Sequence, residues 1–212
     1  MASQQVLLIR HGETQWTLSG QHTGITDIPL TDNGRQVAAR WRPLLTMRSF
    51  DLVLTSPLQR ARETCELAGL GAQAQIDRDL CEWNCGRYEG LTSAQIRAER
   101  PNWMIFRDGC PEGESPRQVS ARVDRVIAKV LSVTGDVALF AHGHLLRVFG
   151  ARWVGLDAID GSHLMLDPAT ACVMTFYKGV PAIKRWNAPV SFAVERGDRV
   201  DEPHRRSALV SP

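Results

Sequence analysis

Three short apolar runs that predict buried strands, 6–9, 51–55 and 137–141, are each followed by basic or imidazole side chains. The side chains in question are Arg10, His11, Arg60 and His142. The carboxyl ends of parallel strands meet at one edge of a sheet, where open α/β folds bind their ligands. We therefore expect two arginines and two histidines to converge on one rim of the protein.

This combination of side chains favours a pocket for an anion, and for a phosphoryl group in particular. Arginine presents a planar fork of N–H donors that matches phosphate oxygens and stays charged at working pH. Predicted helices that begin near Pro57 and Gly143 add backbone N–H groups and positive dipole ends. A neutral imidazole there can attack phosphorus, and water can then cleave the phosphohistidine. The positive charges would stabilise the transition state, so this chemistry needs no metal ion and no other cofactor.

Cleavage of a phosphomonoester also needs a proton donor for the departing alkoxide. A carboxylic acid in an apolar setting can keep its proton near neutral pH. Glu82, between Cys81 and Trp83, has such neighbours, and Glu89 is the alternative. The sequence leaves the choice between these two carboxyl groups open.

Each residue taken alone also has a simpler structural explanation. A histidine after a strand is usually a buried structural residue, and Arg60 alone would be a surface charge on a helix. The side chains of Trp83, Trp103 and Met104 could stack on a substrate, but side chains of this kind more often pack in a core or a lid. The hypothesis therefore depends on the agreement of three strand ends. Arg147 is a weaker candidate for a third arginine and is expected to lie behind the pocket.

Length and composition are those of one ordinary globular domain. The chain has 212 residues, is 43% hydrophobic and 23% charged, and carries a formal net charge of +2. These values exclude a disordered chain and give no reason to expect nucleic acid or a membrane surface as a partner. Only three of the 25 basic residues are lysine, an excess of arginine that compositional bias explains best. The chain start lacks the features of a signal peptide, so we expect a cytoplasmic protein whose five cysteines are reduced thiols.

Strands alternate with amphipathic helices along the chain, which predicts an α/β fold with a mostly parallel sheet. Expected helices run from Thr31 to Leu45, from the Ser56-Pro57 cap onward, over 92–100, from Ser115 to Gly135, and over 144–154. The irregular stretches 12–30, 81–115 and 155–170 are expected to form the walls of the site. Segments 173–177 and 182–186 could close the sheet as a hairpin that pairs across a homodimer. We expect a single domain over 1–194 and a polar, flexible tail over 195–212.

The motifs, in this order, resemble the histidine phosphatase superfamily in its phosphoglycerate mutase-like branch. The matching segments are 8–14, 19–24, 30–34, 56–61, 82–86, 88–90, 113–115 and 141–144. The resemblance implies a three-layer α/β/α sandwich around a mostly parallel sheet, the phosphoglycerate mutase-like fold. It implies that the phosphorylated nucleophile is His11, that the proton donor is Glu82, and that the phosphoryl ligands are Arg10, Arg60 and His142. It further implies a substrate-binding set at the entrance, made of Thr17, Gln21, Thr23, Gly24 and Gly143.

Two departures from the mutases of this family favour hydrolysis over phosphoryl transfer. Thr17 stands where the mutases carry asparagine, and only about fifty residues separate Gly90 from Ala141, without the longer basic insertion of the mutases. The stretch 16–24 together with Glu82-Trp83 resembles most the acid-phosphatase and sedoheptulose-bisphosphatase-like subgroup. The sequence thus predicts a metal-independent phosphatase for a small phosphorylated metabolite such as a sugar phosphate. A phosphoglycerate mutase-type transferase and a non-catalytic phosphoryl-binding module are the alternatives.

Overall fold

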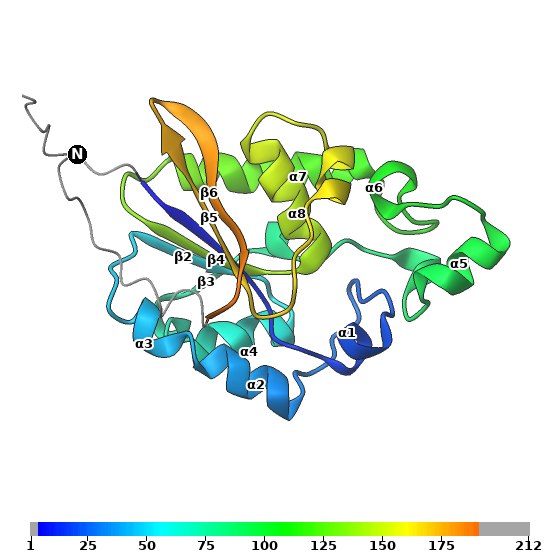
Figure 1. Cartoon of the computed structure of the whole chain (residues 1–212), viewed down its shortest axis with the longest axis horizontal. Coiled ribbons are helices and arrows are strands. Elements are labelled where there is room, and N and C mark those ends of the chain that lie inside the picture. Colours follow the sequence, from blue (N-terminus) through cyan, green and yellow to red (C-terminus); the bar gives the residue numbers. More distant parts are fainter. Residues whose placement is uncertain (1–3, 191–212) are drawn as a thin grey trace, which may run out of the picture.

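The computed structural model, which describes residues 4–190, is built around one six-stranded sheet (Figure 1). The strand order is β3-β2-β4-β1-β5-β6. The strands are β1 (Val6–Arg10), β2 (Leu52–Thr55), β3 (Gln75–Ile76), β4 (Val137–Ala141), β5 (Ala171–Tyr177) and β6 (Val180–Ala188). Strands β1 to β4 pair in parallel with one another, whereas β5 is antiparallel to β1 and forms an antiparallel hairpin with β6 at one edge. The mostly parallel sheet and its closing hairpin confirm the sequence prediction.

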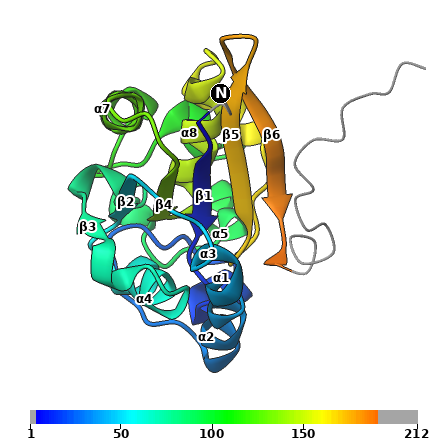
Figure 2. The ribbon, with the colours of Figure 1, turned by 90° about the vertical axis from the view of Figure 1, so that its left-hand side faces the viewer.

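Helices cover both faces of the sheet (Figures 1 and 2). The helices are α1 (Gln15–Ser19), α2 (Asp32–Ala39), α3 (Arg42–Leu45), α4 (Gln59–Leu67), α5 (Ser93–Glu99), α6 (Ile105–Asp108), α7 (Pro116–Leu131) and α8 (Gly143–Trp153). Within residues 4–190, four 3₁₀ segments lie between these elements: η1 (Gly71–Gln73), η2 (Arg78–Leu80), η3 (Gly86–Tyr88) and η4 (Ala158–His163). In Figure 1, α7 and α8 lie above the sheet and α2, α3 and α4 lie below it.

Alternation of side chains along the central strands produces the three layers. In β1, Val6 and Leu8 pack into the core under α7 and α8, while Leu7 and Ile9 pack against α3 and α4. Both faces of a parallel sheet are buried in this way. Its strands are therefore continuously apolar, without an alternation of apolar and polar residues. The expected three-layer α/β/α sandwich is the observed fold.

The register of the sheet sets the place of the site. Arg10 at the end of β1 pairs with Ala141 at the end of β4, and Thr55 at the end of β2 pairs with Phe140. The residues that follow these ends therefore emerge side by side at one edge. This juxtaposition confirms the expected convergence of the three strand ends.

Several predicted element boundaries were wrong. The expected helix 31–45 is two helices, and α7 ends at Leu131 instead of reaching Gly135. Helix α4 begins at Gln59 with Leu58 as its N-cap, so Ser56 does not cap it. The short α1 and the two-residue β3 were not predicted, because neither shows a periodic apolar pattern. The predicted tail 195–212 lies outside the described residues. No helix within residues 4–190 has the length and apolar character to cross a bilayer.

Two glycines allow the loop after β1 to lie directly against α2. A Cβ atom on Gly12 would stand 2.7 Å from the carbonyl oxygen of Gly34, and one on Gly34 would stand 2.3 Å from that of Glu13. Both clashes involve backbone atoms, which cannot rotate away. Thr31 Oγ1 caps α2 by accepting a hydrogen bond from Gly34 N at 2.9 Å, which fixes the helix at this contact. The loop that carries His11 is thereby held against α2.

We predict that Gly34→Ala lowers the free energy of unfolding, although alanine is the better helix former. Overpacking costs about 1–3 kcal/mol, which outweighs the gain of about 1 kcal/mol from helix propensity. The exposed Gln36→Ala on the same helix is the control and should stay within about 0.5 kcal/mol of the wild type. Urea unfolding measures both variants. A Gly34→Ala protein as stable as the wild type would show that the contact is not restrictive.

Candidate active site

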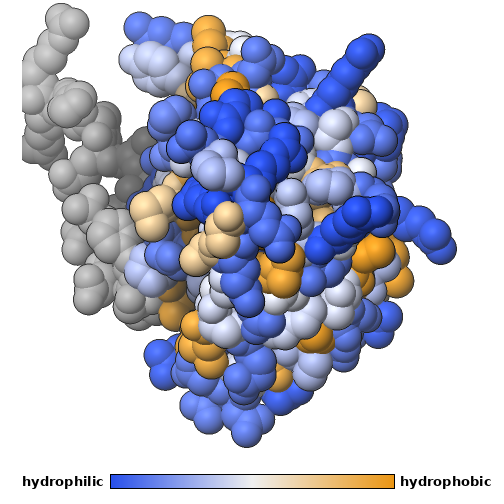
Figure 3. All heavy atoms as spheres, turned by 90° about the vertical axis from the view of Figure 1, so that its right-hand side faces the viewer, coloured by the Kyte–Doolittle hydropathy of each residue, from blue (hydrophilic) through white to orange (hydrophobic). Residues whose placement is uncertain are grey.

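A pocket of about 240 Å³ opens at the carboxyl edge of the sheet. It is lined by Arg10, His11, Trp16, Thr17, Gly20, Gln21, His22, Thr23, Glu82, Gly143, His144, Arg147 and Leu166. Figure 3 shows the face of the molecule on the α5 side, where hydrophilic side chains predominate and hydrophobic groups are scattered. Most of the side chains that line the pocket are themselves polar or charged.

His11 is held in the orientation and tautomer of a nucleophile. Its Nδ1 lies 2.7 Å from the carbonyl oxygen of Gly12, which can only accept a hydrogen bond. The ring proton is thus assigned to Nδ1, and Nε2 keeps its lone pair. Burial, followed by the positive charges of Arg60 and Arg10, lowers the pKa of His11 well below its usual value. The imidazole is therefore neutral at physiological pH.

His142 lies beside His11, with ring centroids 5.1 Å apart. Its Nε2 is 2.7 Å from the hydroxyl oxygen of Ser56, and its buried Nδ1 has no hydrogen-bond partner among residues 4–190. Burial, with the charge of Arg60 next, lowers the pKa of His142 well below its usual value. Ser56, which the sequence predicts as a helix cap, instead fixes this ring. The reason is its position at the end of β2, directly across from the end of β4.

Arg60 is buried and Arg10 is partly buried, and the terminal nitrogens of both guanidinium groups bind backbone carbonyls. Arg10 donates from Nη1 to Leu166 O, and Arg60 donates from Nη1 to Thr26 O at 2.9 Å and from Nη2 to Gly24 O at 2.8 Å. The Nε atoms of both arginines are buried without a partner among the described residues. Burial lowers the pKa of both groups, that of Arg10 to about 10, so both remain charged at neutral pH. Two unpaired buried donors next to two imidazoles fit a phosphoryl group.

The N-terminus of α8 binds the carboxylate of Glu82. This side chain, 4% exposed, accepts hydrogen bonds from the backbone N–H groups of Trp83 at 2.8 Å, His144 at 3.0 Å and Leu145 at 2.9 Å. Burial alone would raise its pKa, but the interaction with His144 and the hydrogen bond from Trp83 N–H hold the pKa well below its usual value. The sequence-based expectation that Glu82 keeps its proton was therefore wrong for the unliganded protein. Apolar neighbours in the sequence did not reveal the helix N-terminus that stabilises the anion.

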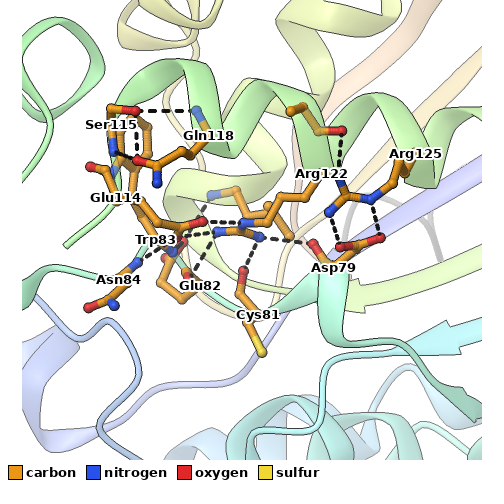
Figure 4. Close-up of polar contacts among 12 residues, drawn as sticks. Asp79, Cys81, Glu82, Trp83, Asn84, Glu114, Ser115, Gln118, Arg122 and Arg125 are labelled. Atoms are coloured by element: carbon orange, nitrogen blue, oxygen red, sulfur yellow. Dashed lines mark hydrogen bonds and ion pairs between the residues drawn. The ribbon is translucent and has the colours of Figure 1, made fainter.

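A buried ion pair holds the segment that carries Glu82 (Figure 4). Arg122 of α7 donates to both carboxylate oxygens of Glu114, at 2.8 and 2.9 Å. The same guanidinium donates to the backbone carbonyls of Asp79, Cys81 and Glu82. Glu114 in turn accepts a hydrogen bond from Asn84 N at 2.9 Å. The segment 79–84 is thus bound to α7 through its own backbone, which positions Glu82 at the pocket.

Most of the predicted substrate-binding residues reach the pocket, but several use their polar groups elsewhere. Thr17, Gln21, Thr23 and Gly143 line it, and Gly24 does not. Thr17 closes the capping box of α1 with its hydroxyl, while the Gln21 amide donates to Gly90 O at 2.7 Å. A Cβ atom on Gly143 would lie 3.1 Å from Arg10 Cζ, so this glycine makes room for the guanidinium.

The structure also adds lining residues that were not assigned to the substrate from the sequence: Trp16, Gly20, His22, His144, Arg147 and Leu166. Arg147, expected behind the pocket as a weaker third arginine, follows His142 by about one turn and a half along α8 and lines the pocket. Leu166 lies in the connection between η4 and β5, within the stretch 155–170 that was expected to form a wall. Trp83 and Trp103 are buried, 0% and 2% exposed, and pack in the core as the simpler explanation predicted.

Comparison with known proteins places these features in a family. The histidine phosphatase superfamily (branch 1) matches residues 6–189. An acid phosphatase of Mycobacterium tuberculosis is 41% identical over 180 residues, covering 83% of this chain and 88% of the relative. Sedoheptulose 1,7-bisphosphatase of Saccharomyces cerevisiae is 36% identical over 183 residues, covering 71% of this chain and 67% of the relative. The solved structure of an open reading frame of Mycobacterium tuberculosis superposes with a TM-score of 0.84 at 38% identity, covering 88% of this chain and 98% of that one.

We predict that the buried histidines make the protein less stable in mild acid. Burial, with the charge of His144 next, lowers the pKa of His22 to about 4. A histidine with a lowered pKa binds fewer protons in the folded than in the unfolded protein. Its contribution to the free energy of unfolding is therefore complete above about pH 6.5 and is lost as the pH falls. His22→Phe keeps a ring against Trp103 but cannot bind a proton, so its free energy of unfolding should fall less steeply with decreasing pH, by up to about 1.4 kcal/mol per pH unit. Urea unfolding at pH 7, 6 and 5 measures it.

The exposed His163→Gln is the matched control for this experiment and should keep the pH dependence of the wild type. If His22→Phe loses stability with falling pH as steeply as the wild type, His22 is protonated in the folded protein and the assignment is wrong.

Proposed function

Because the chain belongs to the histidine phosphatase superfamily (branch 1), we propose that it is a metal-independent phosphatase that hydrolyses small phosphomonoesters through a phosphohistidine on His11. One observation carries this proposal. The His11 ring has its proton on the Gly12 side and its Nε2 lone pair free, next to two charged arginines with unpaired Nε donors. The phosphatase names of the relatives support hydrolysis of phosphoric monoesters.

In the proposed first step, His11 Nε2 attacks phosphorus, an N–P bond forms and the ester P–O bond breaks. Arg10, Arg60 and His142 donate hydrogen bonds to the phosphoryl oxygens, where charge is spread in the transition state. The departing alkoxide takes a proton and leaves as the alcohol. In the second step water attacks the phosphohistidine, inorganic phosphate leaves, and Nε2 regains its lone pair. The proton released by that water returns to the group that protonated the alkoxide.

Glu82 is the proposed proton donor, and its geometry favours it over Glu89. Glu82 lines the pocket with His11, and Glu89 does not. In the unliganded protein Glu82 is an anion at the N-terminus of α8. A bound phosphoryl group brings further negative charge to the pocket, which raises the pKa of a neighbouring carboxyl group. We infer that Glu82 takes up its proton as the substrate binds.

The pocket supports a small polar substrate. Its volume of about 240 Å³ lies below the range of about 300–1,000 Å³ typical of drug-sized ligands. Hydroxyl, amide and imidazole groups of Thr23, Gln21 and His144 surround it, with the ring of Trp16 at the α1 side. A phosphorylated polyol such as a sugar phosphate fits this lining, and a kinetic screen of such compounds would identify the substrate class.

We predict that His11→Ala abolishes turnover while the fold is retained. Removal of a nucleophile should cost at least about 10³-fold in kcat. The exposed His163→Ala is the matched control and should keep full activity. Wild-type protein quenched during turnover of a ³²P-labelled ester should carry acid-labile label, and His11→Ala should carry none. Retained activity or label in His11→Ala would contradict the mechanism.

The same labelled ester separates hydrolysis from the alternatives. Release of label as inorganic phosphate supports the phosphatase, whereas transfer to a second hydroxyl compound would identify a mutase-type transferase. Binding of phosphate without turnover of any ester in a broad panel would identify a binding module.

We predict that the rate for esters with poor leaving groups rises as the pH falls below 7. The donor must carry a proton, and the lowered pKa of Glu82 means that protonated carboxyl becomes more abundant toward acid pH. Glu82→Gln cannot supply this proton and should flatten the acidic limb. For p-nitrophenyl phosphate, whose leaving group needs little protonation, the loss should be much smaller. An unchanged profile with poor leaving groups would exclude Glu82 as the donor.

A further inference from the structure

Glu89 is a carboxylate next to the active site that the proposed reaction does not use. Its oxygens accept hydrogen bonds from Gly24 N at 3.1 Å, Ile25 N at 2.9 Å and Thr26 Oγ1 at 2.7 Å. A fourth donor, Cys85 N, lies at 3.3 Å. All three residues of the loop 24–26 therefore bind one side chain, which comes from the connection after η3.

The opposite side of the same loop binds Arg60. The carbonyl oxygen of Gly24 accepts from Nη2 at 2.8 Å and that of Thr26 accepts from Nη1 at 2.9 Å. The peptide unit between Gly24 and Ile25 thus has its N–H on Glu89 and its C=O on Arg60. A peptide unit is planar and its two polar groups point in opposite directions, so fixing the N–H fixes the direction of the C=O. The peptide is a rigid link between the carboxylate and the guanidinium.

The loop lies so close to its neighbours at Gly24 that a side chain there would not fit. A Cβ atom on Gly24 would stand 2.0 Å from Glu89 Oε1, 2.5 Å from Trp83 O and 2.7 Å from Cys85 N. Glycine therefore lets the loop approach Glu89 and the backbone after Glu82 at the same time. This contact explains why Gly24 belongs to the site without lining the pocket.

We propose that Glu89 is a positioning residue that sets the plane of the Arg60 guanidinium through the loop 24–26, and thereby directs Arg60 Nε toward the phosphoryl group. The inference rests on the proposed function, because it assumes that Arg60 binds the phosphoryl group. Each terminal nitrogen binds one carbonyl, whereas Nε is buried and has no partner among the described residues. When a guanidinium is held at two of its nitrogens, the direction of the third is fixed as well. Glu89 acts on the anion through Arg60 and does not touch it.

The test measures the affinity for inorganic phosphate by isothermal titration calorimetry, a readout that does not need turnover. Glu89→Gln and Glu89→Ala should weaken phosphate binding by about 10-fold, the size expected for loss of one charge-assisted hydrogen bond. Thr26→Val removes one hydrogen bond to Glu89 without changing any charge and should weaken binding in the same direction, by less. Glu112→Gln is the matched control, since Glu112 is an exposed carboxylate that also binds an arginine, Arg87. It should bind phosphate like the wild type.

A double-mutant cycle with Arg60→Ala decides whether Glu89 acts through Arg60. In the Arg60→Ala protein, adding Glu89→Gln should change phosphate affinity by less than about 2-fold, because coupled residues are not additive. Equal weakening with and without Arg60 would overturn the proposal, and so would wild-type affinity in Glu89→Gln. Should Glu89→Ala fail to fold by circular dichroism, Glu89→Gln and Thr26→Val carry the test. A wild type that binds phosphate without hydrolysing any ester contradicts the proposed function alone, whereas one that does not bind phosphate contradicts both.

Discussion

The burial of two positive guanidinium groups beside two imidazoles is the constraint on which the site depends. Removing a charge from water is costly unless it is paired or hydrogen-bonded. Here the backbone carbonyl of Leu166 accepts a hydrogen bond from Arg10, and those of Gly24 and Thr26 accept hydrogen bonds from Arg60. The same buried positive charge keeps His11 neutral, because protonation would add another cation to the pocket. Charge that prepares the site for an anion therefore also prepares the nucleophile.

Carboxylates and backbone groups around the site hold the segments that carry these side chains. Glu114, paired with Arg122, holds the segment before the pocket, and Glu82 binds the N-terminus of α8 (Figure 4). Glu89 binds the loop 24–26. Each of these carboxylates accepts backbone N–H groups, so the protein fixes loops through main-chain geometry rather than through side-chain packing alone. Rigid support of this kind lets short loops present catalytic groups with little freedom.

The sequence predicted the parts of the site that follow from strand ends and missed those that depend on packing between distant segments. Apolar runs locate β1, β2 and β4, and parallel pairing then brings Arg10, His11 and His142 together. Thr31 and Ser115 were identified as helix caps because capping is a local interaction. The partner of Ser56 is a histidine 86 residues away, which no local pattern reveals. The ionisation of Glu82 likewise depends on a distant helix, which begins at Gly143.

The balance of charge around His11 explains why an anionic Glu82 suits this chemistry. Arg10, Arg60 and Arg147 contribute three positive charges and Glu82 one negative charge, so the site carries two net positive charges before a substrate binds. A phosphomonoester dianion would bring the total to zero and would place its negative charges beside the carboxylate of Glu82. Like charges repel strongly in a water-poor site, which supports the proposal that Glu82 takes up a proton as the substrate binds. In this proposal the N-terminus of α8 stabilises the carboxylate before the substrate arrives, and the donor gains its proton in the complex in which it is needed.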